Sequence, residues 1–312
     1  MTDTLIPGPA ASGTVVSEAP ITADEFSALR ESRAAVPARI AEALAGRVRR
    51  PFLRGDKRLF LVAADHPGRG ALGVGTNEMA MANRYDLLQR LATALSRPGV
   101  DGVLATPDII DDLVLLGALD DKVVVGSVNR GGLRGATFEM DDRNTGYSID
   151  GIGASGIDAA KVLLRVNLGD ASCVSTIEAV ATIVSQSAAA EIPILLEPFM
   201  SNWVDGRIVN NLSTDAVVTS IAIASALGTS SAYSWLKLPV VADMERVMSA
   251  TTLPTLLLGG DPQTAPEETY ASWESALALP GVRGLVVGRS LLYPADGDVA
   301  AAVDTAASLV HP

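Results

Sequence analysis

The sequence is poor in the side chains that build disulfides and transition-metal centres. Its 312 residues include one cysteine and two histidines. Cys173 alone excludes an internal disulfide framework and a cysteine-rich zinc site. His66 and His311 are too few for a metal site built from histidines. We therefore expect neither a metal ion nor another cofactor.

Positive charge is also scarce: 24 lysines and arginines stand against 36 aspartates and glutamates, which gives a net charge of −12. A surface that binds nucleic acid or an anionic membrane needs a basic face, so neither is an expected partner. The N-terminus lacks the basic and apolar segments of a signal peptide, and no apolar run reaches the about 18 residues of a membrane span. We expect a cytoplasmic protein.

Apolar residues, by contrast, make up 48% of the chain and recur in short runs between helix-like segments. The run "RLFLVAAD" at 58–65 is typical of a strand that is buried on both faces of a parallel sheet. Further strands are expected at 99–107, 122–128, 159–167, 192–198, around Lys237, at 254–260 and at 282–288. Helical patterns occupy 77–96, 108–119, 171–190, 214–229, 241–250, 266–278 and the C-terminal segment.

Eight strands that alternate with helices predict an α/β fold, a closed (β/α)8 TIM barrel rather than an open doubly wound sheet. We expect residues 51–312 to form a single catalytic barrel domain. Residues 1–50 would precede it as a flexible lead-in and a helical extension, with one or two helices in 22–48.

One glycine-rich motif, taken alone, would indicate a dinucleotide-binding site. The segment "GIGASG" at 151–156 matches the dinucleotide-binding pattern letter for letter. That pattern requires a strand before it and a helix after it. Here a polar loop precedes the segment and a strand follows it, so we expect the segment to be a loop and expect no nicotinamide cofactor.

Charged side chains cluster where the expected strands end, which is where the active sites of such barrels lie. Asp65 and His66 end the first strand, and Glu197 ends the fifth. The other strand-end residues are Lys161, Arg165 and Asn167 on the fourth strand, Lys237 on the sixth, Gly259, Gly260 and Asp261 after the seventh, and Gly288 and Arg289 after the eighth.

Lys237 lies in the apolar run "SWLKLPVV", where an ammonium group is costly, and it is one of only four lysines. One interpretation is a lysine whose stem packs in the barrel while its charged end reaches water. The other is a Schiff-base nucleophile, because burial and a neighbouring cation lower the pKa of a lysine and a neutral amine attacks carbonyls. Lys161 is either that neighbouring cation or the partner of a phosphate or carboxylate.

Asp65 and Glu197 are candidates for proton transfer, since imine chemistry moves protons on and off its intermediates. The alternative for each is a structural carboxylate that holds an arginine or loop amides. A phosphate site often follows the last two strands of such barrels, where backbone amides and an arginine hold the anion. This chain has Gly259, Gly260, Gly288 and Arg289 at that place.

These motifs resemble those of the class I, Schiff-base aldolases, which include tagatose-bisphosphate, deoxyribose-phosphate and archaeal-type fructose-bisphosphate aldolases. The likeness spans roughly 58–295, is strongest to the tagatose-bisphosphate branch, and rests on "AADHPGRGAL", "DAAKVLLRVN", "EIPILLEPFM", "SWLKLPVV" and "LVVGRSLLYP". It implies that Lys237 is the Schiff-base lysine, Lys161 the accessory lysine and Glu197 the fifth-strand carboxylate. Asp65 and Arg69 match the first-strand motif, with two extra residues between them.

The chain also departs from the family pattern. Arg165 and Asn167 stand where family members often carry tyrosines, and the N-terminal helical extension is not part of the common pattern. The resemblance nevertheless implies a metal-independent aldolase that reversibly cleaves a carbon–carbon bond of a phosphorylated sugar or deoxy-keto sugar acid. Arg69 would join Arg289 and the strand-end glycines in holding the phosphate.

Two other functions fit the same barrel: a phosphosugar isomerase or epimerase that needs no imine, and a non-catalytic sugar-phosphate sensor. The loops at 129–147 and 199–212 are expected to select the substrate. Apolar helices such as 214–229 make a homo-oligomer the expected assembly.

Overall fold

The computed structural model describes residues 20–130, 132–259 and 265–312, so most of the expected lead-in, residues 1–19, lies outside it. In the described residues, eight parallel strands form the barrel. They are β1 (Leu59–Ala64), β2 (Gly102–Ala105), β3 (Val123–Ser127), β4 (Ala159–Val166), β5 (Ile194–Val204), β7 (Ser234–Pro239), β8 (Thr255–Leu258) and β9 (Val282–Val287). Their spatial order is β4-β3-β2-β1-β9-β8-β7-β5, and β5 pairs with β4. This closure confirms the predicted TIM barrel.

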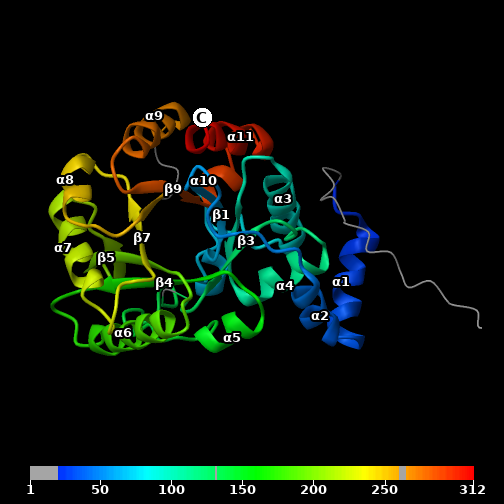
Figure 1. Ribbon diagram of the computed structural model, residues 1–312, viewed down its shortest axis with the longest axis horizontal. Coiled ribbons are helices and arrows are strands. Elements are labelled where there is room, and N and C mark those ends of the chain that lie inside the picture. The colour runs from blue at the N-terminus through cyan, green and yellow to red at the C-terminus, as the bar shows by residue number, and fades with distance from the viewer. Residues whose placement is uncertain (1–19, 131, 260–264) are drawn as a thin grey trace, which may run out of the picture.

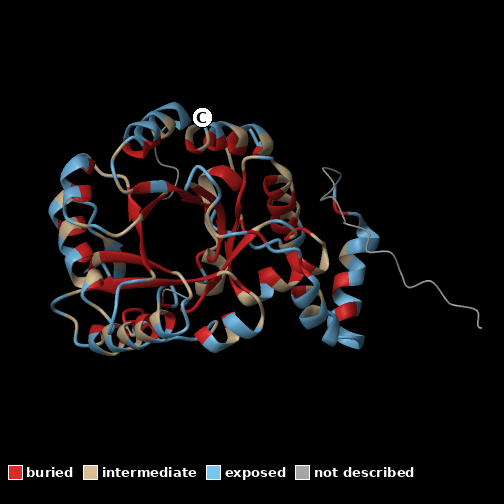
Figure 2. Ribbon diagram, viewed as in Figure 1, coloured by how far each residue is buried: buried red, intermediate tan, exposed pale blue. Residues whose placement is uncertain are grey.

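Helices surround the barrel, as Figure 1 shows. They are α3 (Arg84–Ser96), α4 (Pro107–Leu115), α5 (Ile149–Ala154), α6 (Cys173–Ala189), α7 (Thr214–Ser225), α8 (Met244–Ser249), α9 (Pro266–Leu277), α10 (Arg289–Leu292) and α11 (Val299–Val310), with the 3-10 helix η1 (His66–Arg69) after β1. Their outward faces are exposed, whereas the strands are buried along most of their length (Figure 2). No helix in the described part of the chain is long and apolar enough to cross a membrane.

The N-terminal extension forms two helices, α1 (Ala23–Ala35) and α2 (Ala38–Gly46), which meet at Pro37. Thr22 caps α1, and its side chain accepts a hydrogen bond from the backbone N–H of Glu25, which satisfies a free donor at the helix start. Arg33 of α1 donates to the Asp112 carboxylate of α4. The extension therefore packs on the outside of the barrel, beside α4 (Figure 1).

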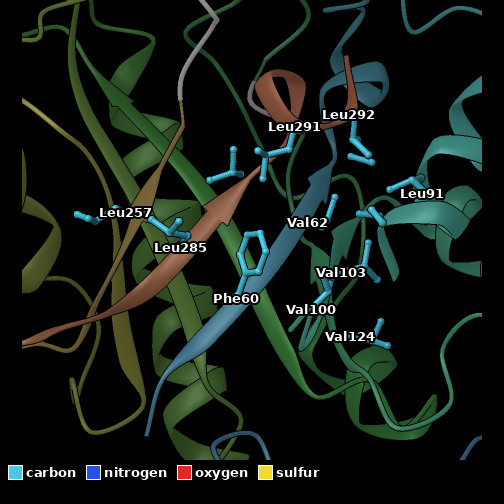
Figure 3. Packing of buried hydrophobic residues seen from close by; sticks show 14 of the residues in the cluster. Phe60, Val62, Leu91, Val100, Val103, Val124, Leu257, Leu285, Leu291 and Leu292 are labelled. Carbon is cyan, nitrogen blue, oxygen red and sulfur yellow. The ribbon is translucent and has the colours of Figure 1, made fainter. Parts of the chain in front are cut away.

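The strands have two apolar faces because both are covered. On β1, Phe60 and Val62 face outward into the layer between strands and helices, together with Leu91 of α3 and Leu285 of β9 (Figure 3). The alternate residues of β1 and its neighbours face the barrel interior, where Leu59, Leu61, Ala63, Leu104, Val125, Leu195, Trp235 and Val286 form a second cluster. This period of two decides which polar residues enter the barrel.

The structure differs from the sequence expectation in three places. The helix expected at 77–96 begins only at Arg84, because Asn83 caps it by accepting from the backbone N–H of Asp86. The loop expected at 199–212 contains the end of β5, which turns back into the antiparallel β6 (Arg207–Asn210). The GIGASG segment begins within the short helix α5 rather than in the expected loop, and this arrangement is also unlike a strand-to-helix phosphate loop.

Candidate active site

Four charged side chains enter the barrel because they continue its inward-facing rows, those of Asp65, Lys161, Glu197 and Lys237. On β7, Trp235 belongs to the interior cluster, so Lys237, two residues later, faces the same way. The same spacing relates Lys161 to Ala159 on β4, and Glu197 to Leu195 on β5. The barrel interior is therefore apolar toward the N-terminal ends of the strands, and the charged side chains lie toward the C-terminal ends.

These four groups form one continuous row of alternating charge. Lys161 Nζ lies 2.7 Å from Asp65 Oδ2 and 2.7 Å from Glu197 Oε2. Lys237 Nζ lies 3.0 Å from Glu197 Oε1. All four residues are buried, and the lysine side chains are only 4% exposed. Lys237 is thus neither a snorkelling lysine nor an isolated buried charge, since Glu197 partners it inside the barrel.

Contacts within the row set the protonation of Asp65, Lys161 and Glu197. Burial alone would lower the pKa of Lys161, but Asp65 and Glu197 outweigh burial and raise it above its usual value. Burial would likewise raise the pKa of Asp65 and of Glu197, yet Lys161 first and Lys237 second hold both below their usual range. Lys161 is therefore an ammonium between two carboxylates at neutral pH.

Asp65 keeps one oxygen available. Its Oδ2 accepts a hydrogen bond from Lys161, whereas its buried Oδ1 has no hydrogen-bond partner in the described part of the chain. The nearest ring nitrogen, His66 Nδ1, is 3.6 Å away. Burial lowers the pKa of His66 to about 3; Asp65 opposes this shift, and Arg69 and Arg289 add to it. His66 is therefore a neutral imidazole at the edge of the site.

The charged row lines a cavity of about 1150 Å³ at the C-terminal mouth of the barrel. Arg69, Arg130 and Arg289 also line it, from the segments that follow β1, β3 and β9. Acidic residues lie toward α8 and α9, where the lining includes Asp243, Glu245 and Glu268. Because the two lysines and two carboxylates of the row balance, the arginines are the charges that favour an anion on their side of the cavity.

The predicted phosphate residues lie at the mouth with one exception, Gly260, which falls outside the described residues. Gly259 and Gly288 line the cavity beside Arg289. Both glycines are also required by packing: a Cβ on Gly288 would lie 2.4 Å from the carbonyl oxygen of Ala63, and one on Gly259 would lie 2.5 Å from Val287 Cγ1.

Arg165 and Asn167 differ from the other strand-end residues. Arg165 is buried in an ion pair with Glu139 of the loop after β3, at 2.7 Å. The Asn167 side chain accepts from the backbone N–H of Gly169 and so shapes the turn that follows β4. Neither lines the cavity.

Several cavity residues were not named individually from the sequence; among them are Arg130 and Phe199, which lie in the two segments expected to select the substrate. Arg130 lies three residues beyond the end of β3, so the strand-end rule that identified the other residues applies to it as well. Phe199 follows Glu197 by two residues on the same face of β5. Strand period and strand ends were thus sufficient signals for both.

Comparison with known proteins gives a family and a fold. Residues 57–307 match the Cgl0159-like family. The crystal structure of Cgl0159 from Corynebacterium glutamicum (Brevibacterium flavum) has 65% sequence identity and a TM-score of 0.91, and the match covers 93% of this chain and 98% of that one. No curated protein matches the sequence.

More distant structures share the barrel. An archaeal fructose 1,6-bisphosphate aldolase is 18% identical with a TM-score of 0.61, over 87% of this chain and 99% of its own. Another archaeal fructose-1,6-bisphosphate aldolase, with its catalytic lysine covalently bound to the carbinolamine intermediate, is 18% identical with a TM-score of 0.62, over 88% and 100%. At this identity the likeness concerns the fold. The family match over most of the sequence, together with 65% identity to Cgl0159, shows that the chain belongs to the Cgl0159-like family.

Proposed function

We propose that this protein is a class I aldolase, an aldehyde-lyase that reversibly cleaves a carbon–carbon bond of a phosphorylated sugar or deoxy-keto sugar acid through a Schiff base at Lys237. The observation that carries the proposal is the buried amine of Lys237, which opens on a large cavity with Glu197 Oε1 at 3.0 Å. A lysine in such surroundings is suited to attack a carbonyl, and Glu197 is within reach of the protons that the attack displaces.

The two lysines have different roles. Lys161 contacts two carboxylates at 2.7 Å and remains an ammonium, which has no electron pair with which to attack. It instead holds Asp65 and Glu197 ionised and offers a positive charge to an oxyanion. Lys237 contacts Glu197 alone among the ion pairs of the described residues, so it is the nucleophile of the proposed reaction.

Each step of the proposed carbon–carbon cleavage conserves protons and electrons. The Lys237 amine adds to the ketone carbonyl, and the carbinolamine loses water to give an iminium ion. A carboxylate takes the proton from the hydroxyl β to the iminium carbon, the carbon–carbon bond breaks, and its electron pair forms an enamine as the aldehyde leaves. The enamine carbon takes back a proton, and water hydrolyses the imine to release the ketone.

Asp65 or Glu197 is the carboxylate that moves these protons. Asp65 is suited to the substrate hydroxyl because its Oδ1 has no hydrogen-bond partner in the described residues. Glu197 is suited to the carbinolamine because it already contacts Lys237. The phosphate would lie beside Arg69 and Arg289, with the glycines that follow β8 and β9 allowing its close approach.

Borohydride reduction with dihydroxyacetone phosphate tests the proposal. We expect a stable secondary amine that maps by peptide mass spectrometry to Lys237. Lys237→Met should abolish the adduct, whereas the matched control Lys122→Met, which removes a lysine outside the cavity, should leave it unchanged. An adduct at another lysine refutes the mechanism. Absence of any adduct across a panel of phosphorylated ketones, or turnover of phosphosugars that survives Lys237→Ala, would favour the sensor or the isomerase instead.

A further inference from the structure

Arg165 departs from the aldolase pattern, and its surroundings show why an arginine suits this position. It lies near the end of β4, and its side chain is 6% exposed, as is that of its partner Glu139. Arg165 Nη1 donates to Glu139 Oε1 at 2.7 Å, and Nη2 donates to the Glu139 carbonyl oxygen at 3.2 Å. One guanidinium thus holds both the side chain and the backbone of a residue in the loop between β3 and α5.

The contacts around this ion pair define the path of the loop. The other carboxylate oxygen of Glu139 accepts from the backbone N–H of Gly135 at 2.8 Å. Gly132 has φ +69°, and a Cβ there would lie 2.0 Å from the Glu139 carbonyl and 2.6 Å from Arg165 Nη2, so the loop closes tightly over the pair. Thr176 of α6 donates to the Met140 carbonyl, which fastens the other side of the loop.

The loop in turn contacts Arg69, a residue that lines the cavity. The backbone N–H of Arg134 donates to the carbonyl of Arg69 at 2.9 Å. Arg69 lines the cavity, whereas Arg165 does not. Burial lowers the pKa of Arg69, and the positive charge of Arg165 adds to this shift. Glu139 neutralises Arg165, while no ion pair joins Arg69 to a carboxylate in the described residues.

We propose that Arg165, through its ion pair with Glu139, is a positioning residue that fastens the loop against η1 and so holds Arg69 toward the cavity for the anionic group of the ligand. The inference rests on the proposed function, in which Arg69 binds the phosphate. It assigns to Arg165 a role in affinity for the phosphate that does not involve touching the ligand.

The test is a double-mutant cycle on ligand affinity in a Lys237→Met background, which cannot form the imine. The dissociation constant of dihydroxyacetone phosphate is measured by calorimetry for the parent, Arg165→Met, Arg69→Met and the double variant. We expect Arg165→Met to weaken binding about tenfold, the scale of one charge-assisted hydrogen bond. The double variant should bind no more weakly than Arg69→Met, because Arg165 acts through Arg69.

A merely structural role for Arg165 gives a different pattern. Its loss would then add to that of Arg69→Met and would also slow borohydride trapping of unphosphorylated dihydroxyacetone at Lys237. We expect that trapping to be unchanged in Arg165→Met. Arg165→Lys, which keeps the charge, covers the case in which the methionine variant fails to fold, and it should show a smaller loss confined to the phosphorylated ligand. Arg246→Met, at an exposed ion pair, is the control.

The outcomes separate this inference from the proposed function. Parent-like affinity in Arg165→Met, additive losses, or equal losses for both ligands overturn the inference. Failure of the Lys237→Met parent to bind dihydroxyacetone phosphate overturns it too, because Arg69 would then hold no phosphate. If dihydroxyacetone phosphate binds to the Lys237→Met parent but the protein that retains Lys237 traps no ketone, the proposed chemistry fails. The double-mutant cycle then still decides the role of Arg165.

Discussion

Replacing Lys161 by methionine removes the cation at the centre of the charged row. Asp65 loses its 2.7 Å partner, and Glu197 keeps only Lys237 at 3.0 Å. Removal of one member of a buried ion pair costs about 3–5 kcal/mol, because the remaining charge stays buried without compensation. We expect Lys161→Met to lose about that much free energy of unfolding at pH 7.

The loss should depend on pH in a defined direction. In the native protein the pKa values of Asp65 and Glu197 lie below their usual range, because Lys161 and Lys237 outweigh burial. These carboxylates therefore contribute stability above about pH 4, and the contribution is lost as the pH falls through the lowered pKa values. Without Lys161, burial dominates and raises the pKa of Asp65, so the variant loses stability as the pH rises. The difference between the two proteins must then grow from pH 4 to pH 7.

Urea unfolding at both pH values, followed by tryptophan fluorescence and circular dichroism, measures the difference. Coincident transitions in the two signals establish that a single free energy applies. Lys122→Met, which removes a hydrogen bond to the Val100 carbonyl, is the matched control and should cost about 1 kcal/mol. A loss below about 1 kcal/mol for Lys161→Met, or one that is the same at pH 4 and pH 7, would refute the account of the row as a compensated buried charge network.

Two further predictions concern other parts of the barrel. His311 contacts Asp101 at 3.0 Å and Asp56 at 2.5 Å, and these contacts raise its pKa against burial, Asp101 having the largest effect. His311→Gln should therefore lower the free energy of unfolding by about 1 kcal/mol at pH 6 and by little at pH 9. The stabilising contribution of protonated His311 is present below about pH 6.5 and is lost as the pH rises through the raised pKa. Melting curves at the two pH values check this prediction. Gly288→Ala places a Cβ 2.4 Å from the Ala63 carbonyl and should cost about 1–3 kcal/mol in urea unfolding; unchanged stability would mean that β9 and β1 separate without strain.

The barrel was predictable because its signals are local. Short apolar runs and helical periods set the order of the elements, and the period of two within strands decides that Lys237 shares a face with Trp235. Capping residues are local signals as well, but they decide where a helix begins. With Asn83 as its N-cap, α3 begins seven residues later than the apolar pattern indicates. The hairpin of β5 and β6 was missed because the turn at Asp205–Gly206 lies in a segment without a buried face.

The pairings within the site were not predictable, because they join residues far apart in the sequence. Asp65 and Lys161 are 96 positions apart, and Arg165 and Glu139 are 26 apart. Their contact depends on strand register and loop path, which residue types alone do not set. Strand-end position was enough to place Asp65, Lys161, Glu197 and Lys237 at one mouth, but not to show that Lys161 lies between the two carboxylates.

The central position of Lys161 supports Lys237 as the proposed nucleophile, the assignment that the sequence resemblance implied. Both lysines are buried at the same mouth, and both belong to strands that face the cavity. Two carboxylates at 2.7 Å keep Lys161 protonated, and the raised pKa makes the loss of its proton at neutral pH costly. An iminium at Lys161 would moreover keep its charge but only one N–H, so it could no longer donate to both Asp65 and Glu197 when one of them must act as a base. An imine at Lys237 leaves Lys161 in place, so the carboxylates keep their partner throughout the reaction. If the Lys237→Met protein formed an imine at Lys161 with ordinary efficiency, this reasoning would be wrong.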